Sequence, residues 1–111
     1  MSSYDLTTKD FRGYRQASLP NIDESLSRVG PETSCGEYLR RYWHPVSLTS
    51  DVSETPKEIR ILGEDLVIFK TTKNNIGLVH KNCPHRRASL VYGKTEEKGI
   101  RCCYHGWLFS P

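Results

Sequence analysis

The chain has 111 residues, of which 36% are hydrophobic, and its formal net charge is +3 at neutral pH. A chain of this length forms one domain at most, and its basic residues are scattered among acidic ones, which does not favour a nucleic-acid interface. No apolar run approaches the roughly 20 residues of a membrane span, and the polar start Ser2–Asp5 does not resemble a secretory signal. We therefore expect a small soluble cytoplasmic module without a nucleic-acid or membrane partner.

The first 45 residues form a leader without a strand pattern. Residues 1 to about 30 are polar and show no clear periodicity, which predicts an irregular or mobile arm. The run Ser34–Glu37 has the form of a capping box, and it predicts a short helix that continues to Tyr42. His44-Pro45 should end this helix, because the residue before proline avoids helical geometry. We expect the aromatic residues of the helix to form an apolar face that docks on another domain.

From residue 57 the pattern changes to short strands separated by turn residues. Segments with alternating or buried β-forming residues are 58–61, 66–69, 76–79, 100–102 and 107–109. Turns are predicted at Gly63–Asp65 and at Thr72–Asn75, where asparagine tolerates a positive φ. The predicted fold class is mainly β, a small antiparallel sheet scaffold that follows an irregular arm and one short helix.

Two strings near the end of the chain each combine cysteine with histidine. They are Cys83-Pro84-His85 and Cys102-Cys103-Tyr104-His105, with 16 residues between His85 and Cys102. Two thiolates and two imidazoles are the ligand set of a Rieske [2Fe–2S] centre, in which one iron takes sulfur and the other takes nitrogen. Each string must then serve both irons. Because residues two apart in an extended segment point the same way, Cys83 and His85 are expected to reach the cluster side by side.

Structural zinc is the alternative for the same four side chains. Zinc loops usually place paired cysteines about two to four residues apart and paired histidines about three to five apart, whereas here each loop is a mixed pair. The pattern therefore favours the cluster, whose histidine ligands set a reduction potential of roughly −150 to +300 mV and which carries one electron. The other histidines, His44 and His80, are expected at a helix end and a strand end rather than as ligands.

The residues around both loops resemble those of Rieske non-haem iron oxygenases. Cys83–Leu90, Gly99–Cys102 and Tyr104–Trp107 are similar to the cluster-binding region of the large-subunit family that includes phthalate dioxygenase, related aromatic-ring oxygenases and O-demethylases. Leu39–Val46 resembles the segment that leads into this region in the same family. One departure is Arg87, where the commonest family pattern has glycine, and it removes no ligand.

The resemblance assigns Cys83 and Cys102 to one iron and His85 and His105 to the other. On spacing alone Cys103 competes with Cys102, because Cys103-x-His105 would mirror the first loop. The resemblance favours Cys102, and Cys103 is then expected to be a small buried hydrophobe.

The same resemblance implies a Rieske-type domain over residues 46–111, C-terminally incomplete, after the arm and helix of residues 1–45. The domain would carry one [2Fe–2S] cluster and take electrons from a flavin or iron–sulfur reductase. It would serve as the N-terminal part of an aromatic-ring-hydroxylating or O-demethylating oxygenase that is a homotrimer at full length. The mononuclear Fe(II) site of such an oxygenase belongs to a C-terminal domain outside this sequence, so we expect a truncated chain that is not an oxygenase by itself.

Two other functions fit the residues less well. A free-standing Rieske ferredoxin would use the same ligands, but such carriers usually begin close to the first strand, whereas this chain has a leader of about 45 residues before it. A structural zinc module is the second alternative. The sequence does not name a substrate.

Overall fold

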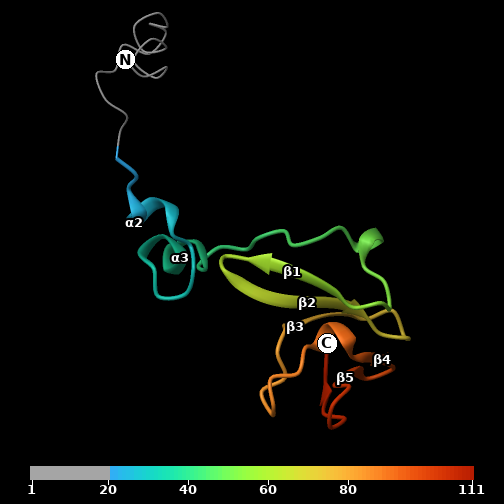
Figure 1. Cartoon of the computed structure of the whole chain (residues 1–111). Coiled ribbons are helices and arrows are strands. Elements are labelled where there is room, and N and C mark those ends of the chain that lie inside the picture. Colours follow the sequence, from blue (N-terminus) through green and yellow to red (C-terminus); the bar gives the residue numbers. More distant parts are fainter. Residues whose placement is uncertain (1–20) are drawn as a thin grey trace, which may run out of the picture.

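The computed structural model of the chain describes residues 21–111, and Figure 1 shows its elements. Residues 1–20, the larger part of the predicted polar arm, lie outside the described residues. Two short α-helices come first, α2 (Glu24–Ser27) and α3 (Ser34–Leu39). The strands that follow are β1 (Lys57–Ile61), β2 (Glu64–Lys70), β3 (Ile76–His80), β4 (Lys94–Glu96), β5 (Gly99–Arg101) and β6 (Leu108–Phe109). Two 3-10 turns lie between these elements, η1 (Thr49–Asp51) and η2 (Leu90–Tyr92).

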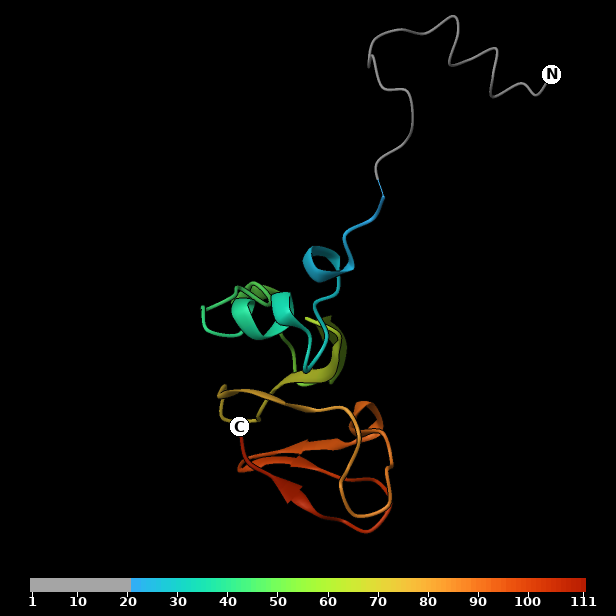
Figure 2. The ribbon, with the colours of Figure 1, turned by 90° about the vertical axis from the view of Figure 1, so that its left-hand side faces the viewer.

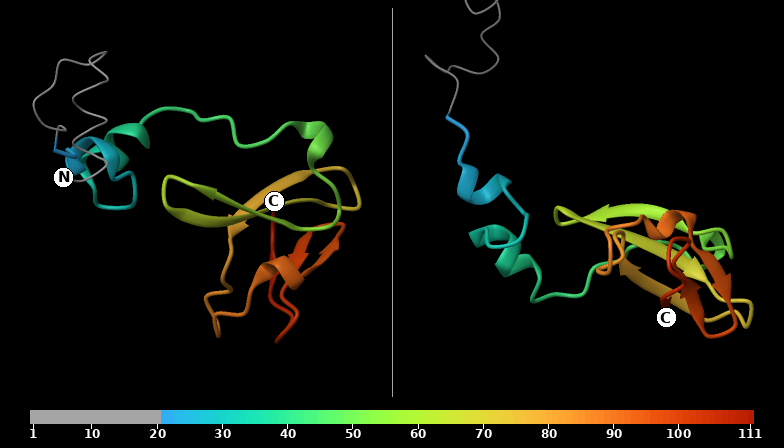
Figure 3. Two further views of the ribbon diagram at one scale, coloured as in Figure 1. Left: turned by 45° about the horizontal axis from the view of Figure 1, so that its top comes forward. Right: turned by 60° about the horizontal axis from the view of Figure 1, so that its bottom comes forward.

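The strands form two three-stranded antiparallel sheets, in the orders β1-β2-β3 and β4-β5-β6. This confirms the predicted mainly β fold, with the scaffold divided into two sheets that lie together at one end of the described chain (Figure 3). The amide of Thr72 donates to the carbonyl of Glu96 at 3.3 Å. The hydroxyl of Thr95 donates to the carbonyl of Glu54 at 2.9 Å. These bonds attach β4 to the segments on either side of the first hairpin.

The turn between β1 and β2 differs from the prediction. It consists of Leu62 and Gly63, whose φ angles are 50° and 77°. Two residues with positive φ give the tight hairpin turn whose twist matches that of the flanking strands. Glu64 and Asp65, which we predicted in the turn, therefore belong to β2. The next turn fits the prediction, because Asn74 has a φ of 65°.

Helix α3 begins one residue earlier and ends sooner than predicted. Its N-cap is Thr33, whose hydroxyl accepts from the amide of Gly36 at 3.2 Å. The carboxylate of Glu37 accepts from the amide of Glu32 at 2.9 Å, so the acidic side chain reaches past the cap. The helix ends at Leu39 and gives way to a turn before His44 is reached.

Within residues 21–111 no helix has the length and apolarity needed to cross a lipid bilayer.

Arg40 attaches this helical segment to the β1–β2 turn. Its guanidinium donates to the carbonyls of Val29, Gly30 and Leu62 at 3.1, 3.3 and 2.9 Å. A Cβ on Gly63 would lie 2.9 Å from the Cα of Gly30, so the two backbones meet closely there. The helices consequently lie beside one end of the first hairpin (Figure 1).

The core includes the first residue of each Cys/His loop. Val67 and Phe69 of β2 are fully buried, and they pack in one cluster with Cys83, Leu90, Ile100 and Cys102. Burial of large apolar side chains is the main favourable contribution to folding. The same packing that stabilises the two sheets therefore fixes where both loops begin.

The first loop, residues 83–88, is a closed turn. The amide of Cys83 donates to the carbonyl of Ala88 at 2.8 Å, and the amide of Arg87 donates to the carbonyl of Cys83 at 2.8 Å. The side-chain amide of Asn82 donates to the carbonyl of Arg87 at 3.0 Å. The loop is thus a turn and not the extended segment that we predicted, because the backbone satisfies its own hydrogen bonds within the loop.

The second loop, residues 102–107, repeats this closure. The amide of Cys102 donates to the carbonyl of Trp107 at 2.8 Å, and the amide of Gly106 donates to the carbonyl of Cys102 at 3.1 Å. Arg101 adds a bond from its guanidinium to the carbonyl of Gly106 at 2.7 Å. The same guanidinium makes two bonds to the carboxylate of Glu96, at 2.8 and 2.9 Å. Both loops lie at the end of the molecule opposite the N-terminal helices (Figure 2).

The fifth residue of each loop has a left-handed backbone. The φ of Arg87 is 64° and that of Gly106 is 77°. Glycine adopts this region freely, whereas a residue with a Cβ loses roughly 1–2 kcal/mol there. The departure from the family's glycine therefore leaves the turn in place and puts strain on the backbone of Arg87.

Arg87→Gly should stabilise the protein. Relief of roughly 1–2 kcal/mol of strain is partly offset by about 0.4–1 kcal/mol of added entropy in the unfolded chain, so we expect a net gain of roughly 0.5–1 kcal/mol in the free energy of unfolding. Denaturant unfolding measures this difference. Arg86→Gly is the matched control, because it removes the neighbouring arginine where the φ is negative, and it should destabilise slightly. A free energy for Arg87→Gly at or below that of Arg86→Gly would contradict the strain.

The Glu96–Arg101 pair should make the second loop sensitive to acid. The hydrogen bond from Arg101 lowers the pKa of Glu96 below its ordinary value of 4.5, against a smaller opposing effect of burial. The stabilisation is complete above the unfolded pKa and is lost as pH falls through the lowered folded pKa. Glu96→Gln should therefore increase amide hydrogen exchange in residues 102–107 at neutral pH.

The difference between wild type and Glu96→Gln should shrink as the pH falls through the lowered pKa of Glu96, because wild-type Glu96 then becomes protonated and neutral like the glutamine. Glu97→Gln serves as the control, because it removes the adjacent carboxylate without affecting the bonds to Arg101. A difference between wild type and Glu96→Gln that does not change with pH would rule out this pair as the source.

Candidate metal centre

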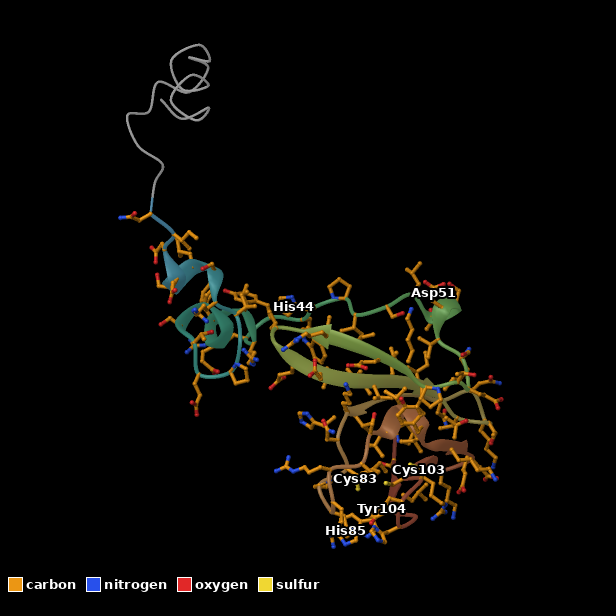
Figure 4. The ribbon with its side chains drawn as sticks, viewed as in Figure 1. His44, Asp51, Cys83, His85, Cys103 and Tyr104 are labelled. Atoms are coloured by element: carbon orange, nitrogen blue, oxygen red, sulfur yellow. The ribbon has the colours of Figure 1, made fainter. Side chains whose placement is uncertain are left out.

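The two loops place one cysteine each in the core. Cys83 and Cys102 are 2% and 4% exposed, whereas the adjacent Cys103 is exposed. The expectation that Cys103 is buried was therefore wrong. The reason is the turn, because the chain reverses direction after Cys102 and carries the next residue out of the core. Figure 4 shows Cys83 and Cys103 near the base of the loops.

Cys102 lies in an environment that favours its thiolate. A hydrogen bond from the backbone amide of Tyr104 lowers the pKa of the Cys102 thiol, and burial of the thiol acts in the opposite direction. Smaller hydrogen-bond contributions lower the pKa further, from the Cys83 side chain, the amide of His105 and the Cys103 side chain. The thiolate is the form that binds metals. Hydrogen bonds to cysteine sulfur also adjust the potential of an iron–sulfur cluster. The contact between the two buried thiols places the sulfur atoms of both loops together.

The histidines lie together at the exposed end of the loops. The ring centroids of His85 and His105 are 4.6 Å apart, with their planes at 66°. Trp107 stacks on His85 at 4.7 Å and 5°, and Tyr104 meets His105 edge-on at 3.9 Å and 70°. Four rings from two loops thus form a continuous row, and Figure 4 shows His85 and Tyr104 at the loop tips with Cys83 further inside.

The four predicted ligands form two pairs, with sulfur inside and nitrogen outside. In the part of the chain that the structure describes, no three His, Cys, Asp or Glu side chains gather to hold a single metal ion. A [2Fe–2S] cluster divides its ligands in the same way, since two sulfurs bind one iron and two nitrogens bind the other. The donor set and its division into a buried and an exposed pair fit this group.

The remaining histidines do not belong to either loop. His44 lies beyond the end of α3 and not at it as predicted, but its Nε2 atom is 2.7 Å from the carbonyl oxygen of Leu39, the last residue of the helix (Figure 4). His80 is exposed at the last position of β3. Two residues that support the site were missed in the sequence, namely Arg101 and Trp107. The available signal was their sequence position, since Arg101 directly precedes Cys102 and Trp107 lies two residues after His105, but the contacts depend on how the loop closes.

Comparison with known proteins gives a family match. The family model described as "Rieske [2Fe-2S] domain" matches residues 42–111. The chain is 57% identical over 88 residues to the phenoxybenzoate dioxygenase subunit alpha of Ectopseudomonas oleovorans, covering 79% of this chain and 22% of that protein. It is 50% identical over 103 residues to the tert-butanol monooxygenase / tert-amyl alcohol desaturase oxygenase subunit of Aquincola tertiaricarbonis, covering 90% and 22%. The chain thus spans about a fifth of the length of these relatives.

Solved structures show the same likeness. The crystal structure of dicamba monooxygenase with non-haem iron and dicamba is 29% identical, with a TM-score of 0.57 over 62% of this chain and 21% of that one. The oxygenase of carbazole 1,9a-dioxygenase, solved in complex with its ferredoxin, is 28% identical with a TM-score of 0.51, covering 62% and 18%. These matches confirm the resemblance to Rieske oxygenases that the residues around the two loops indicated. The chain therefore belongs to the Rieske [2Fe–2S] domain family, among the oxygenase subunits of Rieske oxygenases.

Proposed function

We propose that this chain holds its [2Fe–2S] cluster through Cys83 and Cys102 on one iron and through His85 and His105 on the other. The observation that carries this is the arrangement of two equally closed loops, which place their first cysteines in one core cluster and their histidine rings 4.6 Å apart at the surface. Burial of Cys102 and exposure of Cys103 support Cys102 as the ligand of the second loop.

We infer different tasks for the inner and the outer end of the site. Val67, Leu90 and Ile100 pack with the two cysteines and exclude water from the sulfurs. The exposed histidines are the end through which an electron can arrive or leave, since the opposite end is covered by both sheets. When bound, the cluster supplies reversible one-electron transfer at a potential of roughly −150 to +300 mV.

We propose that the electron relay serves an oxygenase that hydroxylates or O-demethylates aromatic compounds. Phenoxybenzoate dioxygenase and dicamba monooxygenase, to which the chain is similar, support an aromatic substrate. The tert-butanol monooxygenase, in contrast, is named for an aliphatic alcohol. The mononuclear iron of such an enzyme would be held outside the matched residues. In this proposal the domain comprises residues 46–111, and residues 1–45 form its leader.

We propose a flavin or iron–sulfur reductase in the cytoplasm as the electron donor. The ferredoxin complex of the carbazole oxygenase supports a protein donor. Arg86 and Arg87 are exposed beside His85, and such a basic pair accelerates encounter with an acidic protein surface. The complete protein would assemble as a homotrimer.

The two adjacent cysteines provide the sharpest test of the ligand assignment. Cys102→Ser should abolish the cluster, because it removes the buried sulfur, whereas Cys103→Ser should keep it. The measurements are iron, zinc and acid-labile sulfide contents and the electron paramagnetic resonance spectrum after reduction. Wild type and Cys103→Ser should contain iron and sulfide in equal amounts and give a Rieske-type signal.

Two results would contradict the proposal. Zinc in a colourless wild-type protein would establish the structural zinc alternative. Loss of the cluster in Cys103→Ser with retention in Cys102→Ser would reassign the second thiolate.

A further inference from the structure

Trp107 belongs to the second loop, but its side chain contacts the first. Its carbonyl accepts from the amide of Cys102 at 2.8 Å and closes its own loop. Its indole ring stacks on the imidazole of His85, with centroids 4.7 Å apart and planes within 5° of parallel. One residue therefore couples the backbone closure of one loop to the ring orientation of a ligand in the other.

The ring of His85 has two ring neighbours from the second loop, His105 edge-on and Trp107 in parallel, and only Trp107 lies against its face. Among the described residues no hydrogen bond fixes its imidazole, although a metal-binding histidine is usually oriented by a hydrogen bond from its second ring nitrogen. The torsion that rotates an imidazole about its Cβ–Cγ bond has broad minima, so the plane of an exposed ring needs a second contact to define it. The parallel indole supplies such a contact.

Simple burial does not explain the position of Trp107. The side chain is 47% exposed, and it is not part of the core cluster. The other flanking ring, Tyr104, is the sequence neighbour of His105 and meets it edge-on within a single loop. The stack of Trp107 on His85 therefore differs in kind, since it joins the two loops.

We propose that Trp107 is a positioning residue that sets the ring plane of His85 for binding the histidine-held iron. This inference rests on the proposed ligand assignment. A ring held in the binding orientation before the cluster arrives lowers the entropy lost on binding, and loss of an outer-shell partner that orients a ligand reduces metal affinity by about 10- to 100-fold.

The test compares Trp107→Leu and Trp107→Phe with Trp43→Leu in the full chain carrying its cluster. Trp43 is the matched control, because it is the other of the two tryptophans and is fully exposed near the helices. The readouts are the g values and line widths of the reduced cluster and the rate of cluster loss to an iron chelator. Trp107→Leu should broaden and shift the signal and accelerate cluster loss about 10-fold.

Trp107→Phe should restore both readouts toward wild type, because it keeps a flat ring over His85, and Trp43→Leu should match wild type. If Trp107→Leu binds no cluster at all, the Phe variant decides: recovery of the signal supports the proposal, and failure overturns it. Wild-type spectra and loss rates in Trp107→Leu, or equal effects of Trp107→Leu and Trp43→Leu, would also overturn it. A wild-type protein without any Rieske signal would instead refute the proposed function.

Discussion

The packing of two cysteines against one apolar cluster is the constraint on which the rest of this structure depends. Cys83 and Cys102 come from different loops and meet among core side chains supplied by both sheets. Because a well-packed interior leaves little room for displacement, the core fixes the position at which each loop begins. The histidines then need only the short turns that follow to arrive at the same place on the surface. A shift of either sheet would separate both ligand pairs at once.

The loops add a second level of order through backbone hydrogen bonds. Each loop closes through hydrogen bonds to the amide and the carbonyl of its own cysteine. External support is modest and specific, with Asn82 on the first loop and the Arg101–Glu96 pair on the second. Such pre-formed surroundings suit electron transfer, since a site whose ligands are already placed requires little rearrangement. The strained backbone of Arg87 shows that this shape is kept even where the residue disfavours it.

Much of the domain was predictable from local pattern, and the exceptions share a cause. The buried run 66–69 and the turn at Asn74 were located correctly because hydrophobic patterning and turn residues act over a few positions. Glu64 and Asp65 were misplaced, since no propensity indicates that Leu62 will adopt a positive φ. The exposure of Cys103 followed from a turn where an extended segment was expected. The stack of Trp107 on His85 joins loops that are distant in sequence, and periodicity carries no information about such contacts.

The equal closure of the two loops gives the mixed Cys-x-His and Cys-x-x-His spacing a geometric meaning. Both turns run from a cysteine to a left-handed fifth residue, so the spacing does not measure loop length. It records which position of a common turn carries the imidazole: the third in one loop and the fourth in the other. Two turns closed by the same hydrogen bonds thus carry their imidazoles at different positions, and the planes of the two rings meet at 66°. An iron held by both imidazoles would need its two nitrogen donors to approach from different directions. An offset of one residue between the loops lets two turns with the same closure meet that need.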